Sequence, residues 1–506
     1  MIAGNACPAP IGLHHREMVM SEAIQGLSPA LLWDLFARIA VIPHGSKNEA
    51  ALASHLRLMA EKAGLHVRQD DAGNLCIAVP PSPGCEKAPA VVLQAHLDMV
   101  CEKNASFAFD FARDAIRLVR DGDWMKADGT SLGADNGIGI AGAMAVAVSK
   151  DILHGPLEVL LTVDEETGLT GAVSLSPSLV RGRILLNMDS EKSDHLCIGC
   201  AGGAELSILL PLTLTDIPMH AAALGLTLTG LRGGHSGLDI HENRANAVAL
   251  MARLVLALQE HGALLADVQG GDKHNAIPRE SSATVVLPAA RLETARESLT
   301  TRYRAMAAAF AHETTLQMSC RETALPTRTL SGASSAAAVH MLTAIPHGVL
   351  AMSRHLPGLV ETSSNLAAAH IHNNLLTVHT MSRSSVPQAL LSAMEQIAAI
   401  GSLAGGRCER GPSYPGWHPD PHSKILTVVE KTYEEICGSK PARTATHAGL
   451  ECGVIGEKFP GMDMLSFGPD IINAHSPDEA VNIPSVATFL NILIGTLRKV
   501  ATGDYA

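Results

Sequence analysis

Hydrophobic positions follow two different patterns along the chain, and the first covers residues up to about 203. Apolar runs of four to eight residues alternate there with segments of helical spacing, as in a sheet whose strands are buried on both faces. Ser28 and Pro29 predict an N-cap and a first helical residue before an amphipathic helix. The predicted helices cover 30–40, 48–63 and the glycine-rich 137–150, and the predicted strands cover HVRQ (66–69), LCIAV (75–79), AVVLQA (90–95), PLEVLLTV (156–163) and RILLNMD (183–189).

The second pattern begins near residue 204, where apolar and polar residues alternate as in half-exposed antiparallel strands. It is seen in ELSILLPLTL (205–214), ALGLTLTGL (223–231), SSATVVLP (281–288) and LLTVHTMSRS (375–384), with helices predicted over 244–260 and 291–311. From Pro387 the first pattern returns, with helices near 388–403, 423–437 and 485–500. We therefore expect an α/β domain interrupted by an insert of roughly 190 residues, a size typical of a domain of its own. The expected parts are an N-terminal extension (1–26), the first part of the α/β domain (27–203), the insert (204–386) and the second part (387–506).

Composition and charge narrow the class of protein. The 506 residues are 47% hydrophobic and 17% charged, which predicts a folded chain with a large core. A net charge of −12 argues against nucleic acid as a partner, because such proteins carry a basic patch. The N-terminus lacks the basic and apolar regions of a signal peptide, and no apolar run approaches about 18 residues. Ten cysteines in so long a chain suit a reducing compartment. We expect a cytoplasmic protein without a membrane partner, with Met18 and Met20 as alternative starts.

Metal-type side chains stand where the predicted strands of the first pattern end. His96 and Asp98 are two positions apart and so share one face of their strand. Each residue or pair alone has an ordinary structural explanation, but ligands of open α/β sheets gather at the carboxyl ends of strands. Nitrogen and oxygen donors without a thiolate suit two divalent ions such as zinc, manganese or cobalt. The set comprises His96, Asp98, Asp135, Glu165, Glu166, Asp189 and His475.

Several longer stretches resemble the M20 metallopeptidases, and within them the aminoacyl-histidine dipeptidases. The resemblance covers the chain from about Leu27 onward. It implies an α/β di-metal catalytic domain, a mixed sheet flanked by helices, with an inserted α+β lid domain. The stretches are VVLQAHLDMV, TSLGADNGIGIA, HGPLEVLLT, the CAGG of 200–203, GGHSG, NAIPRE, SYPGW, HAGLECG and HSPDE.

The resemblance also implies roles for the residues at the strand ends. One metal would be held by His96, Asp135 and Asp189, and the other by Asp135, Glu166 and His475, so that the Asp135 carboxylate bridges the two. Glu165 matches the general base, and Asp98 matches a carboxylate that orients His96. A cis peptide bond is implied between Asp135 and Asn136. Zinc is the first choice for both ions, with manganese or cobalt as alternatives.

In the insert, the resemblance implies that His235 polarises the scissile carbonyl and that Asn275 and Arg383 recognise the substrate. Arginine suits a substrate carboxylate because its fork matches two oxygens. The simpler structural alternatives are an anchored loop, a capped turn and a surface charge, respectively. Asp164, directly before the glutamate pair, departs from the family pattern and would raise the pKa of Glu165 by repulsion between like charges.

The implied function is hydrolysis of Xaa-His dipeptides by a metal-activated water with Glu165 as general base. Cleavage of β-alanyl-histidine, the range of first residues and the native metal stay open. The alternatives are another M20 metalloamidase, such as an N-acyl amino acid deacylase or a desuccinylase, and a non-catalytic binding protein on the same scaffold. We also expect a homodimer, and leave open whether His235 acts within its own chain or across the dimer.

Overall fold

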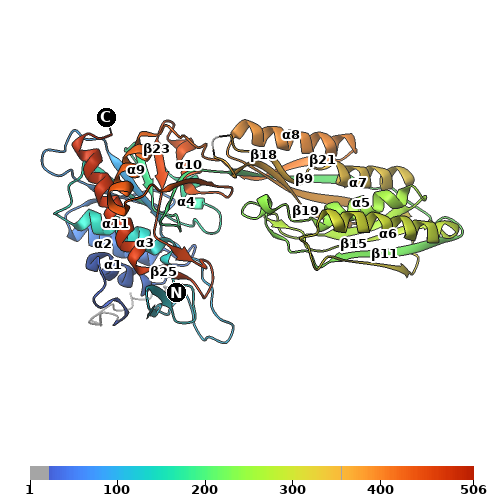
Figure 1. Ribbon diagram of the computed structural model, residues 1–506, viewed down its shortest axis with the longest axis horizontal. Helices are drawn as coiled ribbons and strands as arrows, with labels where there is room; N and C mark the ends of the chain where they lie inside the picture. The colour runs from blue at the N-terminus through green and yellow to red at the C-terminus, as the bar shows by residue number, and fades with distance from the viewer. Residues whose placement is uncertain (1–21, 355, 506) are drawn as a thin grey trace, which may run out of the picture. The chain divides into compact units, whose positions relative to one another are not determined.

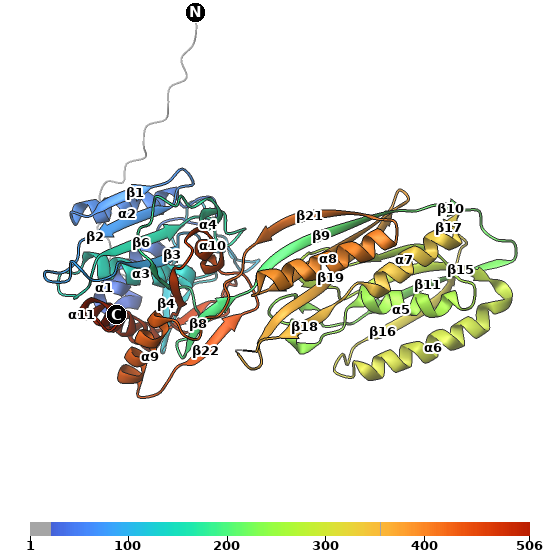
Figure 2. The ribbon, with the colours of Figure 1, turned by 90° about the horizontal axis from the view of Figure 1, so that it is seen from above.

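The computed structural model describes residues 22–354 and 356–505, and these form two compact units (Figures 1 and 2). The expected N-terminal extension falls outside the described residues up to position 21, as do the alternative starts. Described residues up to 193, 431–440 and 467–505 belong to what we call the first unit. The second unit comprises 194–430 and 441–466.

In the first unit, five strands are hydrogen-bonded in the order β1-β2-β6-β3-β7. β3 pairs in parallel with β6 and β7, whereas β2 is antiparallel to its neighbours. Every residue of β3, β6 and β7 is buried, which confirms the strands predicted from the uniformly apolar runs. The bounds are β1 (His66–Gln69), β2 (Leu75–Val79), β3 (Val91–His96), β6 (Leu157–Thr162) and β7 (Ile184–Asn187).

The helix α3 (Ala134–Val148) is almost completely buried, and its glycines allow close packing. A Cβ on Gly137 would lie 3.0 Å from the ring of Phe36 in α1, and one on Gly142 would lie 3.0 Å from Phe489 in α11. The glycine-rich run is therefore explained by helices that approach its backbone. The other helices of this unit are η1 (Glu22–Ile24), α1 (Ala30–Ala40), α2 (Ala50–Lys62), α4 (Thr170–Ser174) and α11 (Ile483–Thr502). The division between the units falls within α9 (Lys424–Cys437), whose residues from 431 onward belong to the first unit.

The start of α1 corrects the sequence analysis. Pro29 itself is the N-cap residue, in an extended conformation and without a side-chain cap, and Ser28 precedes it. The proline side chain has no acceptor, so the first N–H groups of the helix receive no side-chain cap, and Ser28 lies one position before the N-cap. Among the described residues, α11 is the one helix long and apolar enough to cross a membrane. Of its apolar 18-residue window, 56% is buried inside the protein.

A small antiparallel sheet of the first unit joins distant parts of the chain in the order β24-β25-β5-β4. Directly before β25, the buried carboxylate of Glu479 accepts hydrogen bonds from the N–H groups of four consecutive residues, 132–135, at 2.7 to 3.3 Å. These contacts hold the turn that opens α3. The strands are β4 (Leu118–Asp121), β5 (Trp124–Ala127), β24 (Ile471–Ile472) and β25 (Ala480–Asn482).

The second unit contains a nine-stranded sheet in the order β16-β11-β15-β13-β19-β20-β9-β21, with β18 also paired to β19. Its helices α5 to α8 lie along the sheet in Figure 2, and an apolar core that includes Leu226, Leu254 and Ile397 fills the space between. The strands of this sheet are β9 (Gly202–Pro211), β11 (Ala221–Thr229), β13 (Leu264–Gly270), β15 (Ser281–Pro288), β16 (Gln317–Thr323), β18 (Gly348–Met352), β19 (Val360–His372), β20 (Leu375–Ser384) and β21 (Arg407–Tyr414).

The remaining elements of the second unit include the strands β23, β8 and β22, hydrogen-bonded in that order. The short strands form two further pairs, β10 with β17 and β12 with β14. The bounds are β8 (His195–Cys200), β10 (Leu214–Thr215), β12 (Gly234–His235), β14 (Ala276–Ile277), β17 (Thr329–Leu330), β22 (Ala442–Thr446), β23 (Asp463–Ser466), η2 (Ile240–Glu242), α5 (Ala247–Gln259), η3 (Ala289–Arg291), α6 (Leu292–Ala309), α7 (Gly332–Ala344), α8 (Pro387–Leu403) and α10 (Glu451–Lys458).

The contacts of α8 and β21 bear on where the insert ends. Both elements follow Pro387, where the sequence analysis places the second part of the α/β domain. In the structure α8 packs on β9, β20 and β21, and β21 pairs with β9, so both belong to the second unit. The domain boundaries at 203 and 386 stay a prediction, beside this division by contacts.

We expect Glu479→Gln to lower the stability of the first unit, because the amide would turn a donor toward N–H groups that now meet a carboxylate. Leaving such buried donors without an acceptor costs about 1–3 kcal/mol of unfolding free energy. Thermal and urea unfolding of the metal-free protein measure it. Asp478→Asn, at the exposed neighbouring carboxylate, is the control and should unfold as the unaltered protein does. Equal stability of the two variants would contradict the fastening role of Glu479.

Candidate functional site

Three parallel strands of the first unit bring the predicted residues of their carboxyl ends to one edge of the sheet. In register, His96 of β3 stands beside Thr162 of β6, and Gln94 stands beside Asn187 of β7. Glu165 and Glu166 follow β6 within four residues, and Asp189 follows β7 within two. The side chains therefore emerge close together, as parallel pairing requires.

His96 lies at the centre of a first group of donor atoms. The imidazole is 1% exposed, and its Nε2 is 3.0 Å from Oδ1 of Asp135 and 3.2 Å from Oδ1 of Asp189. Its Nδ1 faces the other way, 3.0 Å from the backbone oxygen of Asp98. An N–H at Nδ1 would leave Nε2 as the atom that accepts a metal.

His475 lies at the centre of a second group. Its Nε2 is 3.1 Å from Oε2 of Glu166 and 3.4 Å from Oδ2 of Asp135. The two oxygens of Asp135 thus face different imidazoles, Oδ1 toward His96 and Oδ2 toward His475. In each group the three donor atoms lie within 4.8 Å of one another, close enough for one ion to contact all three.

The residues present fit two divalent cations. Oε1 of Glu166 is buried and has no hydrogen-bond partner among the described residues. Hydrogen bonds to Asp135 and Glu166 raise the pKa of His475 to about 11, so its imidazole carries a proton where the carboxylates attract positive charge. Metal ions displace such protons when they bind. Imidazole and carboxylate donors are ligands of zinc, manganese and cobalt alike.

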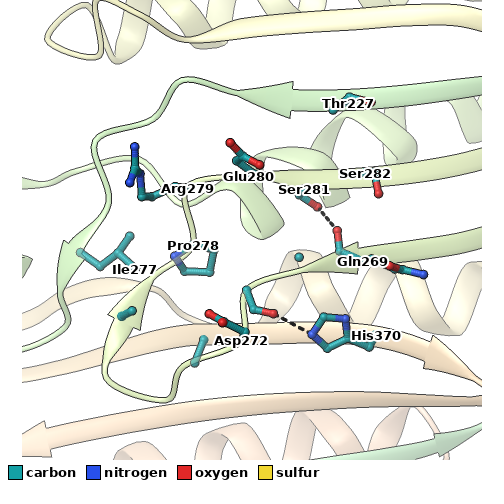
Figure 3. Close-up of a pocket in the computed structure, with 14 residues that line it drawn as sticks. Thr227, Gln269, Asp272, Ile277, Pro278, Arg279, Glu280, Ser281, Ser282 and His370 are labelled. Atoms are coloured by element: carbon teal, nitrogen blue, oxygen red, sulfur yellow. Dashed lines mark hydrogen bonds between the residues drawn. The ribbon is translucent and has the colours of Figure 1, made fainter. Parts of the chain in front are cut away.

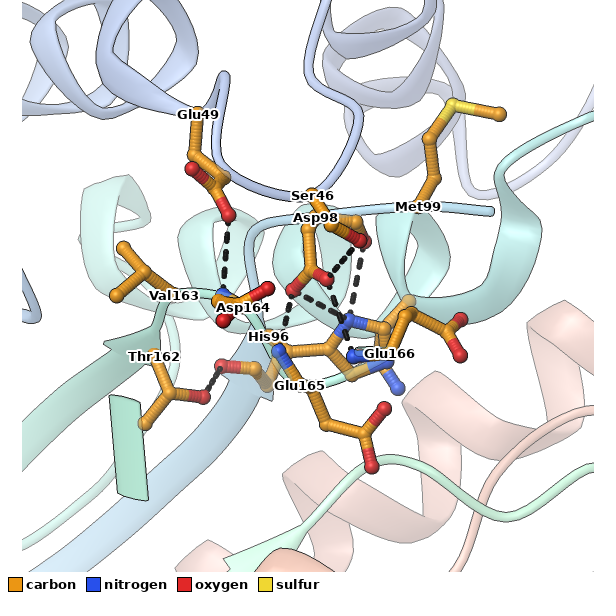
Figure 4. Close-up of polar contacts among 12 residues, drawn as sticks. Ser46, Glu49, His96, Asp98, Met99, Thr162, Val163, Asp164, Glu165 and Glu166 are labelled. Carbon is orange, nitrogen blue, oxygen red and sulfur yellow. Dashed lines mark hydrogen bonds and ion pairs between the residues drawn. The ribbon is translucent and has the colours of Figure 1, made fainter. Parts of the chain in front are cut away.

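Asp98 fastens the turn that carries the glutamate pair, as Figure 4 shows. Its carboxylate accepts hydrogen bonds from the N–H groups of Glu165 (2.9 Å) and Glu166 (3.1 Å) and from the hydroxyl of Ser46 (2.8 Å). Burial would raise the pKa of Asp98, but the hydrogen bonds from His96, Glu165 and Ser46 outweigh it and lower the pKa to about 2. Asp98 is therefore ionised, and its carboxylate holds the turn, while its backbone oxygen lies 3.0 Å from Nδ1 of His96. That Asp98 orients His96 in the reaction stays a prediction.

The side chains of Glu165 and Glu166 leave this turn in different directions (Figure 4). Glu166 reaches His475, whereas Glu165 is partly exposed beside the donor groups. Asp164, before the pair, has a positive φ of 50° and is buried, and its carboxylate accepts a hydrogen bond from the hydroxyl of Thr167. Asp164 thus shapes the turn. Its expected effect on the pKa of Glu165 stays a prediction.

The loop that carries Asp135 has an unusual backbone conformation. The peptide bond between Asp135 and Asn136 is cis, as the resemblance implies, and both residues depart from helical angles. The Asn136 amide donates to the backbone oxygen of Met188 (3.0 Å) and to the Asp189 carboxylate. A Cβ on Gly139 would lie 2.0 Å from Oδ1 of Asn136, so only glycine fits there. The loop is thereby tied to the strand end that carries Asp189.

In the second unit, the contacts of His235 in β12 define its tautomer. Nδ1 accepts hydrogen bonds from the N–H groups of Gly237 (3.2 Å) and Leu238 (3.0 Å), so the proton of the neutral ring lies on Nε2. Burial and the nearby Arg383 guanidinium lower the pKa of His235 to about 4. The side chain is therefore a neutral ring with a free N–H donor.

Arg383 lies beside His235 and is a buried cation, 3% exposed. Its Nη1 donates to the hydroxyl of Tyr414 at 2.6 Å, and its Nε has no hydrogen-bond partner among the described residues. No carboxylate within the described chain forms a salt bridge with it. A buried guanidinium without a counter-ion is costly, so this geometry suits an anionic ligand. The surface-charge alternative for Arg383 is wrong.

His447 closes the same cluster. Its Nε2 is 2.7 Å from the hydroxyl of Ser363, and burial, with the Arg383 charge, lowers its pKa to about 3, so the ring is neutral. Gly237 lies at the centre: a Cβ there would be 2.5 Å from the backbone oxygen of His447 and 3.2 Å from Nε of Arg383. A side chain at position 237 would therefore prevent His235, Arg383 and His447 from lying this close together.

Asn275 directly precedes β14, the strand that pairs with β12 and thus with His235, and it is exposed. Its backbone oxygen accepts a hydrogen bond from the N–H of Ser236 at 2.7 Å, and the strands β12 and β14 pair His235 with Ala276. The residues that follow Asn275 line a cavity of about 600 Å³, whose wall includes Ile277, Arg279 and His370 (Figure 3). His370 bonds within this wall to the backbone oxygen of Gly271, at 2.7 Å. A role of Asn275 in substrate recognition stays a prediction.

Four residues of these sites have no role in the sequence analysis, although motifs quoted there contain most of them. Glu479 belongs to HSPDE, Tyr414 to SYPGW and His447 to HAGLECG. Ser46, in a loop before α2, gives no signal in the sequence because a lone serine has many uses. The other three lie within quoted motifs, so a search for a partner of every polar residue in those motifs would have drawn attention to them.

Comparison with known proteins identifies the relatives of this chain. The family model Peptidase family M20/M25/M40 matches residues 92–499. The cytosol non-specific dipeptidase of Escherichia coli (strain K12) is 40% identical over 483 residues, 95% of this chain and 99% of its own length.

Solved structures agree with this relationship. The aminoacylhistidine dipeptidase of Vibrio alginolyticus is 42% identical with a TM-score of 0.89, over 94% of this chain and 97% of its own. A tripeptidase of Staphylococcus aureus, 15% identical with a TM-score of 0.55 over 94% of this chain and 99% of its own, shares the fold. The chain belongs to the M20/M25/M40 family of peptidases.

Proposed function

We propose that this protein hydrolyses the peptide bond of dipeptides, Xaa-His dipeptides among them. The observation that carries the proposal is the Asp135 carboxylate, shared between two imidazole and carboxylate groups, with Glu165 beside them. The names of the Escherichia coli and Vibrio alginolyticus relatives, both dipeptidases, support the substrate class. We also propose a cytoplasmic location, in keeping with the word cytosol in the first of these names.

His96, Asp135 and Asp189 would hold one divalent cation, and Asp135, Glu166 and His475 the other. When bound, the two cations would supply a Lewis acid for the scissile carbonyl and lower the pKa of a water molecule. Zinc is our first choice, with manganese or cobalt as alternatives. Asp98 keeps the glutamate turn in place, because both of its N–H groups end on that carboxylate.

Glu165 is proposed as the general base. It would accept a proton from the attacking water and return that proton to the leaving amine. His235 would donate its Nε2–H to the oxygen of the scissile carbonyl as negative charge develops there. Its neutral state supports this role, because the donor proton is then held at Nε2 across the neutral pH range.

Arg383 is proposed to bind the carboxylate of the second residue of the dipeptide, with Asn275 as a further substrate contact. The buried and unpaired Nε of Arg383 supports a negatively charged ligand. Tyr414 would position the guanidinium through its hydroxyl. An N-acyl amino acid also carries this carboxylate, so a deacylase is the alternative that substrate comparison must exclude.

We expect Glu165→Gln to retain two metal ions per chain and to lose about 10²–10⁴-fold in kcat, the usual worth of proton transfer. Metal analysis beside steady-state kinetics on Ala-His measures both. Chelation of the unaltered enzyme should abolish activity, and zinc, manganese or cobalt should restore it. If the variant loses metal together with activity, Glu165 is a ligand rather than the base.

We expect a free carboxylate on the second residue to matter through Arg383. The unaltered enzyme should prefer Ala-His over its C-terminal amide by about 10²-fold in kcat/KM, the loss typical when one partner of a buried charge pair is removed. Arg383→Gln and, more weakly, Tyr414→Phe should reduce this preference, and Arg253→Gln on an exposed face should not. Better turnover of N-acetyl-histidine than of Ala-His would favour the deacylase.

We propose a homodimer and expect mixing to show which chain supplies His235. His235→Ala alone should lower kcat by about 10²–10³-fold, as the loss of one oxyanion donor does. Chains with His235→Ala and chains with Glu165→Gln are combined, and subunit exchange is verified with labelled protein. Recovered activity means that His235 acts across the dimer, and no recovery means that it acts within its chain. A normal kcat for His235→Ala would leave it a structural role alone.

A further inference from the structure

A recess of the first unit opens beside Glu166. It has a volume of about 480 Å³, within the usual range for ligand pockets, and Glu166 and Thr167 form part of its wall. Glu166 also faces His475 in the second donor group. The recess and the proposed metal site therefore share Glu166, so a substrate bound at the metal site would lie next to this wall.

The rest of the wall is largely apolar. Its polar members have other partners or lie near the solvent: the Ser46 hydroxyl donates to Asp98, and Asn48 is exposed. None of the wall residues is a lysine or an arginine. The apolar part of the wall is made by Met99, Val100, Cys101, Phe111 and Ala112.

The wall is built by two chain segments in close contact. Gly45 permits this approach, because a Cβ there would lie 2.5 Å from Sγ of Cys101. Cys101 is exposed as a residue, but partial desolvation of its thiol, with the charges of Asp98 and Glu102, raises its pKa to about 11, so the thiol is uncharged at neutral pH. Phe111 is braced by the ring of Phe109, 4.8 Å away between centroids. Apart from the carboxylate of Glu166, the recess thus presents an uncharged surface, and the ring of Phe109 supports its aromatic side.

We propose that this recess binds the side chain of the first residue of the dipeptide and that it favours large apolar side chains, such as those of leucine, methionine and phenylalanine. The inference rests on the proposed function. The carboxylate of the second residue needs a cation, which this wall lacks and which Arg383 offers. The first residue supplies the scissile carbonyl, so its side chain starts next to the metal site and reaches the wall beside Glu166.

The first test compares dipeptides that differ only in the first residue. In the unaltered enzyme, kcat/KM should rise by about 10–100-fold from Gly-His to Leu-His, Met-His and Phe-His, because apolar area is removed from water. Hydrolysis of all these dipeptides at equal kcat/KM overturns the proposed recess and leaves the proposed function intact. Hydrolysis of none of them by the metal-loaded enzyme overturns the proposed function itself.

The second test changes the wall at Ala112, which is exposed at its rim and tolerates a larger side chain. Ala112→Leu should lower the ratio of kcat/KM for Phe-His to that for Gly-His by about tenfold. Ala112→Asp should lower the ratio of Leu-His to Gly-His and raise that of Lys-His to Gly-His, a reversal that general damage to the fold cannot cause. Ala108→Leu, an exposed alanine of the same loop that does not line the recess, is the control. Ratios that stay unchanged in both Ala112 variants overturn the proposal.

Discussion

The site depends on one buried carboxylate that belongs to none of the donor groups. Glu479 accepts the N–H groups of residues 132–135, and the last of these is Asp135, whose two oxygens face His96 and His475. The two partners are 344 positions apart in the sequence. The shape of the Asp135 loop therefore depends on a contact with the last part of the chain, and both donor groups depend on that contact too.

Asp98 repeats the arrangement at the neighbouring turn, where it accepts the N–H groups of Glu165 and Glu166. Both fastening carboxylates are satisfied largely by backbone donors rather than by lysine or arginine. A lysine or arginine in place of these backbone donors would repel divalent ions, whereas the dipole of an N–H group carries only partial positive charge. The negative charges of Asp135, Glu166 and Asp189 are therefore not neutralised by a side-chain cation. They attract protons to the neighbouring imidazoles, and metal ions compete with these protons for the same nitrogen atoms.

Much of the first unit could be predicted from the sequence because its signals are local. The uniformly apolar runs gave β3, β6 and β7 within a residue or two, and parallel strands place the residues that follow them at one edge. The partners of Glu479 and Asp98 could not be found this way, since a carboxylate that binds a remote backbone leaves no periodic trace. Strands at a sheet edge, such as β16 and β21, were missed because their mostly polar, partly exposed residues lack the apolar pattern of a strand. Their place was settled by pairing with β11 and β9, which depends on the fold as a whole.

The second unit shows how one buried charge can define the chemistry around it. Burial lowers the pKa of His235 and of His447, and the Arg383 guanidinium lowers both further, so both rings are neutral although each lies among polar groups. Neutrality leaves one N–H on His235, and the N–H groups of Gly237 and Leu238 select Nε2 as its place. The same unpaired guanidinium that suits a carboxylate ligand therefore also prepares the donor proposed for the scissile carbonyl. A lysine could not replace it fully, because its ammonium lacks the planar fork that contacts Tyr414 on one side and leaves Nε free on the other.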